Sequence, residues 1–150
     1  MTKRNWTTAM QLKALLQLCN RLLLDDPSCI PTITLRSLIY TYNKESANAI
    51  VDTTKIIESN PNGAAAYYIR SNCYLEKGQF DLAKQDFMRA LRLQFKDTNP
   101  KLVNGYTEEV ILKATIDGEE ELEEIKKVVS HEVSILYKSY ISPFTSGELD

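Results

Sequence analysis

The side chains best suited to chemistry lie close together in the stretch from Tyr67 to Leu93, which contains Cys73, Arg70 and Asp86. A cysteine acts as a nucleophile only when a neighbouring base or cation holds it as a thiolate. No base accompanies Cys73 in the local sequence, and its helical position is typical of a packing residue. We therefore expect Cys73 to be a buried thiol, and we assign no catalytic residue.

The other potential metal or redox ligands are scattered along the chain. His131 is the only histidine, and no cysteine stands at ligand spacing from it. The three cysteines, which include Cys19 and Cys29, form no CxxC pair and are odd in number. These features predict reduced thiols without a disulfide framework, and no metal site, cofactor or enzymatic activity. A small enzyme that uses Cys73 or His131 is the alternative.

Two pairs of opposite charge recur along the chain at a fixed spacing. Arg36 and Asp52 lie 16 residues apart, and so do Arg70 and Asp86. This spacing spans one antiparallel helical hairpin, in which a guanidinium can meet a carboxylate with bidentate geometry. A catalytic role would hardly be duplicated so evenly. We therefore interpret both pairs as structural ion pairs.

The two pairs belong to an internal repeat, because residues 30–61 align with residues 64–95 without a gap and with an offset of 34. A period of this length is typical of stacked helical units. The matching positions include Arg36 and Arg70, Tyr40 and Tyr74, Ala49 and Ala83, and Asp52 and Asp86. The pattern predicts two copies of one structural unit.

Each unit is predicted to contain two helices. In the second unit, apolar residues recur at spacings of three and four, first as far as Gly78 and again from Phe80 onwards. The small residues Ala83 and Ala90 would let the two helices approach closely. Pro61 marks the break between the units, because proline cannot continue a helix.

The second unit resembles a tetratricopeptide repeat, whose pattern combines small and aromatic residues at fixed positions. The residues that occupy those positions are Tyr67, Ser71, Tyr74, Gly78, Phe80, Ala83, Phe87, Ala90 and Leu91. The first unit resembles the family less closely, because Lys44 replaces the glycine and Ser46 the aromatic residue. The resemblance implies an all-α fold in which antiparallel helix-turn-helix repeats stack as a short α-solenoid.

The remaining segments are expected to complete a single domain over residues 1–150. Residues 5–24 carry apolar positions in the repeat spacing, which predicts a lone N-terminal helix, the second helix of a truncated unit. Residues 100–141 are predicted to form a divergent helical pair whose long last helix caps the solenoid, and residues 142–150 form a polar tail. The first helix of this pair would carry on one face Val103, Tyr106, Val110 and Ala114.

The overall composition argues against some classes of partner. Hydrophobic residues make up 43% of the chain and charged residues 25%, with a net charge of −2. A nucleic-acid-binding surface normally needs a basic excess, so we expect no nucleic acid partner. No apolar run reaches the roughly 18 residues of a membrane span, so we expect no direct membrane insertion. We expect an intracellular, cytoplasmic protein, with mitochondria as the alternative because the basic, acid-poor start is typical of a presequence.

The resemblance also implies a binding surface, because in tetratricopeptide families the first helices of successive units line a concave groove. The positions that would face this groove are Leu35, Leu38, Tyr42, Tyr68, Ile69, Asn72 and Glu76. An apolar groove with aromatic anchors suits an amphipathic helix or an extended peptide segment. The chain's own C-terminal helix is the alternative occupant.

As a whole, the sequence predicts a non-enzymatic protein–protein interaction module. It would act as an adaptor or as a small structural subunit of a multi-subunit assembly, through its groove and helical edges. The alternative is a co-chaperone that binds the C-terminal peptide tails of chaperones. This alternative is weakened because Leu35 and Ile69 stand where the resemblance expects an asparagine of the tail-binding clamp.

Overall fold

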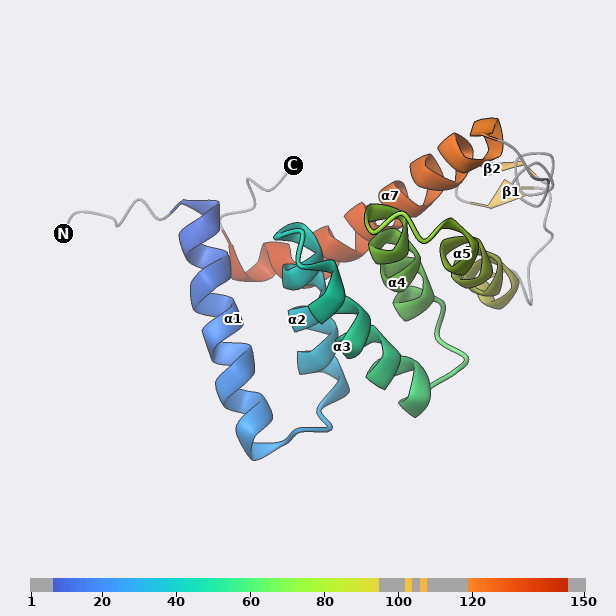
Figure 1. Ribbon diagram of the computed structural model, residues 1–150. Helices are drawn as coiled ribbons and strands as arrows, with labels where there is room; N and C mark the ends of the chain where they lie inside the picture. The colour runs from blue at the N-terminus through green and yellow to red at the C-terminus, as the bar shows by residue number, and fades with distance from the viewer. Residues whose placement is uncertain (1–6, 95–101, 104–105, 108–118, 146–150) are drawn as a thin grey trace.

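Antiparallel helical hairpins stack side by side in the computed structural model, which describes residues 7–94, 102–103, 106–107 and 119–145 (Figure 1). In chain order the elements are α1 (Thr8–Asp25), α2 (Ile30–Tyr42), α3 (Ser46–Ser59), α4 (Ala64–Glu76), α5 (Phe80–Gln94), β1 (Leu102–Val103), β2 (Tyr106–Thr107), α7 (Glu119–Ile141) and the 3-10 helix η1 (Ser142–Phe144). Helices α2 and α3 form one hairpin and α4 and α5 the next, with α1 at one end of the stack and α7 lying across it. The predicted helical solenoid with a long C-terminal helix is confirmed.

Small residues let the two helices of a hairpin approach closely. Ser71 of α4 donates from its Oγ to the backbone oxygen of Ala83 in α5 at 2.8 Å, and both residues are fully buried. A larger side chain at either position would push the helices apart, because protein interiors are close-packed. The small residues of the repeat pattern thus set the distance between α4 and α5.

The turn inside each hairpin has the same backbone geometry. Gly78 has a φ of 73°, and Lys44, its equivalent in the first unit, has a φ of 62°. The N–H of Gly78 donates to the oxygen of Leu75 at 3.1 Å. The N–H of Lys44 donates to the oxygen of Thr41, also at 3.1 Å. Because this left-handed conformation favours glycine, the lysine strains the helix end that the glycine forms freely.

The main hydrophobic core runs through the stack and includes the C-terminal helix. Leu12 of α1, Leu38 of α2 and Phe87 of α5 belong to the same buried cluster as Ile125 and Val129 of α7. Helix α7 packs mainly against α4 and also against α2 and α5. It is therefore part of the core, which is how a solenoid covers an otherwise exposed apolar face.

The helix predicted over the first part of residues 100–141 is wrong where the structure describes it. Leu102 pairs with Thr107, and Val103 with Tyr106, in an antiparallel two-stranded sheet. The intervening Asn-Gly dipeptide is a strong signal for a tight β-hairpin, and the flanking valine and tyrosine favour strands. This local chemistry overrides the helical spacing of Val103 and Tyr106. The other predicted positions of that face, Val110 and Ala114, lie outside the described residues.

Candidate interaction surfaces

Each repeat arginine joins three helices. Arg36 donates to Asp52 of α3, from Nε to Oδ2 at 2.8 Å and from Nη2 to Oδ1 at 2.7 Å, and its Nη1 donates to Asn20 Oδ1 of α1 at 3.0 Å. The hydrogen bonds to Asp52 raise the pKa of Arg36 above its ordinary value. Because the guanidinium stays charged and binds side chains of two neighbouring helices, it serves the packing of the helices.

The second repeat reproduces this arrangement. Arg70 donates to Asp86 of α5, from Nε to Oδ2 at 2.7 Å and from Nη2 to Oδ1 at 2.8 Å, while its Nη1 donates to Thr54 Oγ1 of α3 at 3.2 Å. Asn20 in α1 therefore stands to Arg36 as Thr54 in α3 stands to Arg70. Helix α1 thus contacts α2 in the way that α3 contacts α4.

Among the described residues, no helix pairs with α1 in the way that α2 pairs with α3. Helix α3 packs against α2 on one side and α4 on the other, whereas α1 packs mainly against α2 (Figure 1). On the open side of α1, Leu18 is 45% exposed and Leu22 is 47% exposed. Two leucines that are half in contact with water, one turn apart on the same helix, form an apolar edge, which we call the α1 edge.

The groove residues named from the sequence lie against α7. Leu38, Tyr68 and Ile69 are buried in the same cluster as the apolar face of α7, and Leu35 packs against that cluster. Tyr42 of α2 stacks on Tyr137 of α7, with ring centroids 5.0 Å apart and an interplanar angle of 17°. The chain's own C-terminal helix therefore packs along part of the predicted groove, beside Leu38 and Tyr42.

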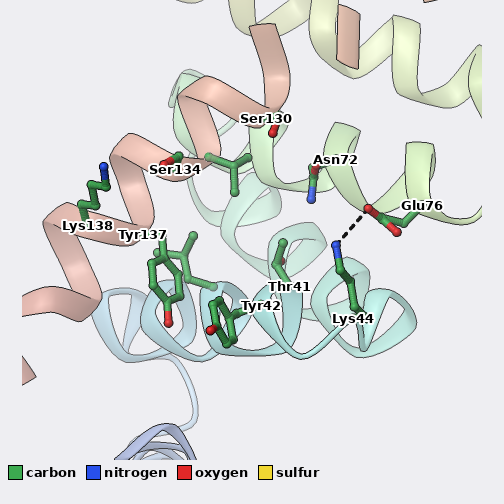
Figure 2. Close-up of a pocket in the computed structure, with 11 residues that line it drawn as sticks. Thr41, Tyr42, Lys44, Asn72, Glu76, Ser130, Ser134, Tyr137 and Lys138 are labelled. Carbon is green, nitrogen blue, oxygen red and sulfur yellow. Dashed lines mark hydrogen bonds and ion pairs between the residues drawn. The ribbon is translucent and has the colours of Figure 1, made fainter. Parts of the chain in front are cut away.

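A cavity of about 310 Å³ remains between α7 and the hairpins, and Figure 2 shows the residues around it. Asn72 and Glu76 of α4 line one side, with Ser130 and Ser134 of α7 opposite. Lys44 Nζ lies 3.2 Å from Glu76 Oε1, and both side chains are well exposed to solvent. The cavity is thus a partly polar opening at the rim of the groove, and neither cysteine nor histidine lines it.

The residues considered for nucleophilic or metal chemistry are not assembled into a site. Cys73 is fully buried, and its burial raises the pKa of the thiol to about 11, so the thiol is protonated at neutral pH. His131 lies on an exposed part of α7. Within the described ranges, no group of three His, Cys, Asp or Glu side chains is placed to hold a metal ion, and none of the helices there is long and apolar enough to cross a membrane.

The tetratricopeptide repeat family model matches residues 64–97, which include the whole α4–α5 hairpin. No curated protein and no solved structure matches the chain. The α4–α5 hairpin is therefore similar to a tetratricopeptide repeat, and it stacks with neighbouring helices in a helical repeat fold. A repeat of this kind suggests a protein–protein interaction module, and such repeats are in general not enzymes.

Proposed function

We propose that the protein is a non-enzymatic interaction module that serves as an adaptor or as a small subunit of a larger assembly, and that it binds its partner through the α1 edge. The observation that carries the proposal is the half-exposed pair Leu18 and Leu22 at the open end of the stack. Covering such leucines with a partner removes apolar surface from water, which favours association.

The concave groove is a weaker candidate for the partner, because α7 already lies in it. A peptide that entered the groove would have to displace the apolar side chains of Val129 and Val133, which are buried against the hairpins. The co-chaperone alternative meets a further obstacle. The side chains of Ile69 and Leu35 are hydrocarbons, so neither can donate a hydrogen bond to a terminal carboxylate. In addition, Ile69 is fully buried and Leu35 is half-buried.

The chemistry of the described residues supports a binding role within the cell. The net charge of −2 does not favour a nucleic acid partner. The thiols of Cys19, Cys29 and Cys73 are all free, which fits a reducing compartment. The two arginine–aspartate pairs act in this proposal as braces that hold the hairpins rigid for binding.

Affinity capture from native extract tests the proposal when the full chain is compared with matched variants. The first variant carries Leu18→Asp and Leu22→Asp on the α1 edge. The control carries Val51→Asp, which places a single negative charge at an exposed apolar position of α3. A third variant, Ser134→Tyr, fills the rim of the groove. Circular dichroism and thermal unfolding of each variant establish that it is folded.

We expect a stoichiometric partner to be recovered with the wild type, with Val51→Asp and with Ser134→Tyr, and to be lost with the α1-edge variant. Loss with Ser134→Tyr and retention with the α1-edge variant would assign the binding surface to the groove and overturn the proposed use of the α1 edge. Recovery of no stoichiometric partner by the wild type would overturn the role as an assembly subunit.

A further inference from the structure

The two leucines of the α1 edge occupy positions that are buried in the complete units. With the repeat offset of 34, Leu18 corresponds to Asp52 in α3 and to Asp86 in α5. Those aspartates are 1% and 6% exposed, because each faces the first helix of its own unit and binds its arginine. Leu18 is far more exposed because no helix described in the structure stands in that place.

Leu22 is likewise exposed at a position whose equivalents in the two complete units are buried. Leu22 corresponds to Ile56 in α3 and to Ala90 in α5, and both of these residues are buried. Leu15 of α1, which corresponds to Ala49 and Ala83, is buried because it also packs toward the core. Leu18 and Leu22 are therefore exposed at positions whose equivalents in the complete units are buried, whereas Leu15 is covered.

The identity of residue 18 determines which type of side chain a helix that docks on the α1 edge must place opposite it. In both complete units, an aspartate at this position accepts two hydrogen bonds from an arginine on the first helix. Leu18 has no acceptor, so an arginine placed opposite it would be desolvated without a partner. A helix that completes this unit must instead carry an apolar residue at that position.

We propose that the α1 edge binds an amphipathic helix of a partner protein, which docks antiparallel to α1 and pairs with it as α2 pairs with α3. Antiparallel docking follows the pairing of α2 with α3 and of α4 with α5. The partner helix carries an apolar residue where α2 and α4 carry Arg36 and Arg70. It carries a small residue one position later, as at Ser37 and Ser71, to accommodate Leu15. This inference rests on the proposed function, because it names the partner of the same edge.

The charges of α1 add to this description of the partner. Lys13 and Arg21 are exposed, and no acidic residue occurs in α1 before Asp25. Acidic residues beside the apolar stripe of the partner helix would therefore be favoured opposite Arg21. The N-terminus of an antiparallel helix would lie near Asp25 and Asp26, whose carboxylates suit the positive end of a helix dipole.

A second copy of the chain fits the same edge poorly. The first helix of a unit from another copy would bring Arg36 or Arg70 against Leu18, where no carboxylate accepts it. Contact between two α1 helices would bring the exposed Lys13 and Arg21 of both copies to one interface with few acids to compensate them. A helix from a different protein meets neither difficulty.

Two helical peptides and one substitution test the inference. Each peptide has 13 residues, the length of α2 and of α4, with acidic flanks and a small residue at the position of Ser37. The peptides differ only in having leucine or arginine at the position of Arg36. Fluorescence anisotropy measures their binding to the full chain, to the Leu18→Asp variant, which restores the aspartate of the complete units, and to the Val51→Asp control.

We expect the wild type and Val51→Asp to bind the leucine peptide at least about tenfold more tightly than the arginine peptide. We expect Leu18→Asp to reverse this preference, because the new carboxylate can pair with the arginine. Equal affinities for the two peptides, absence of binding, or a preference that Leu18→Asp leaves unchanged would each overturn the inference. A dimer in sedimentation that Leu18→Asp dissociates would overturn it in favour of a second copy.

The outcome separates this inference from the proposed function. If the variant with Leu18→Asp and Leu22→Asp loses its native partner while the wild type shows no preference between the peptides, the α1 edge binds a partner of different chemistry and only the inference fails. If the native partner is retained by that variant, the proposed use of the α1 edge fails and the inference fails with it.

Discussion

Arg70 and Asp86 join the two helices of one hairpin through two parallel hydrogen bonds of 2.7 and 2.8 Å. The Asp86 side chain is 8% exposed, and that of Arg70 is 18% exposed. The guanidinium carbon of Arg70 also lies 5.8 Å from the ring centroid of Tyr74 and 5.9 Å from that of Tyr67. A bidentate pair between aromatic rings and shielded from water has a fixed geometry, which suits a brace between helices.

Replacing Asp86 with alanine is expected to lower the free energy of unfolding by about 3 kcal/mol, because it leaves the mostly buried Arg70 without its carboxylate. Chemical denaturation followed by circular dichroism measures the change. The matched control is Asp81→Ala, which removes an exposed carboxylate from the first turn of the same helix and should cost less than about 1 kcal/mol. Equal effects of the two substitutions would show that the pair contributes no more than a surface charge.

Substitutions at the two hairpin turns are expected to change the stability of the protein in opposite directions. Gly78→Ala should destabilise the protein by about 1 kcal/mol, because alanine is strained at a φ of 73°, although open space surrounds its added Cβ. Lys44→Gly should stabilise it by about 0.5 kcal/mol, since glycine relieves the φ of 62° and the exposed contact with Glu76 is weak. Thermal unfolding of both variants checks the signs, and destabilisation by Lys44→Gly would contradict the argument.

The three cysteines should differ in their reactivity toward a thiol reagent. Cys29 is only half-buried and should react in the native protein, whereas Cys19 and Cys73 should react only after unfolding. Because burial raises the pKa of Cys73 to about 11, its thiol stays largely protonated at pH 8, even before access is considered. Burial also raises the pKa of Cys19. Absorbance after mixing with Ellman's reagent, with and without urea, measures the reactive thiols.

The Cys73→Ser variant assigns the signals in that experiment, because it should remove one of the slow thiols and leave the fast one. Rapid labelling of Cys73 in the folded protein would contradict its burial. It would also reopen the interpretation of Cys73 as a nucleophile.

The packing of α7 against the hairpins predicts a contrast between two isoleucines of the same helix. Ile125 is fully buried in the main core and Ile135 is 44% exposed. Ile125→Ala should therefore lower the free energy of unfolding by about 3 kcal/mol, and Ile135→Ala by less than about 0.5 kcal/mol. Urea denaturation of both variants measures the difference. Similar small effects would mean that α7 is not a firm part of the core.

Much of the architecture could be read from the sequence, because the contacts within one hairpin join residues that are close along the chain. The 16-residue spacing of Arg36 and Asp52 matches an ion pair that the structure contains. The offset of 34 also aligns Lys44 with Gly78, and both residues have the same left-handed backbone conformation. These features could be recognised in the sequence because each one occurs in both repeats.

The prediction from the sequence was wrong for one segment beyond the two repeats. The helical spacing of Val103 and Tyr106 pointed to a helix, but these residues pair with each other in a short β-hairpin. With only one copy of this segment, periodicity had no second example to support it. The Asn-Gly dipeptide between the two strands was the signal that would have corrected the prediction.

By itself, the sequence determined the helical hairpins, their order and the residues that brace them, because these depend on local spacing. Only the tertiary structure decided which apolar faces are covered. Helix α7 lies across the first helices of the repeats, so Leu38 and Ile69 are buried, whereas Leu18 and Leu22 stay half-exposed at the end of the stack. All four are ordinary apolar residues of helices in the sequence. Whether an apolar residue is buried depends on which helix packs against it in the tertiary structure. The spacing of residues within a single helix does not specify that neighbouring helix.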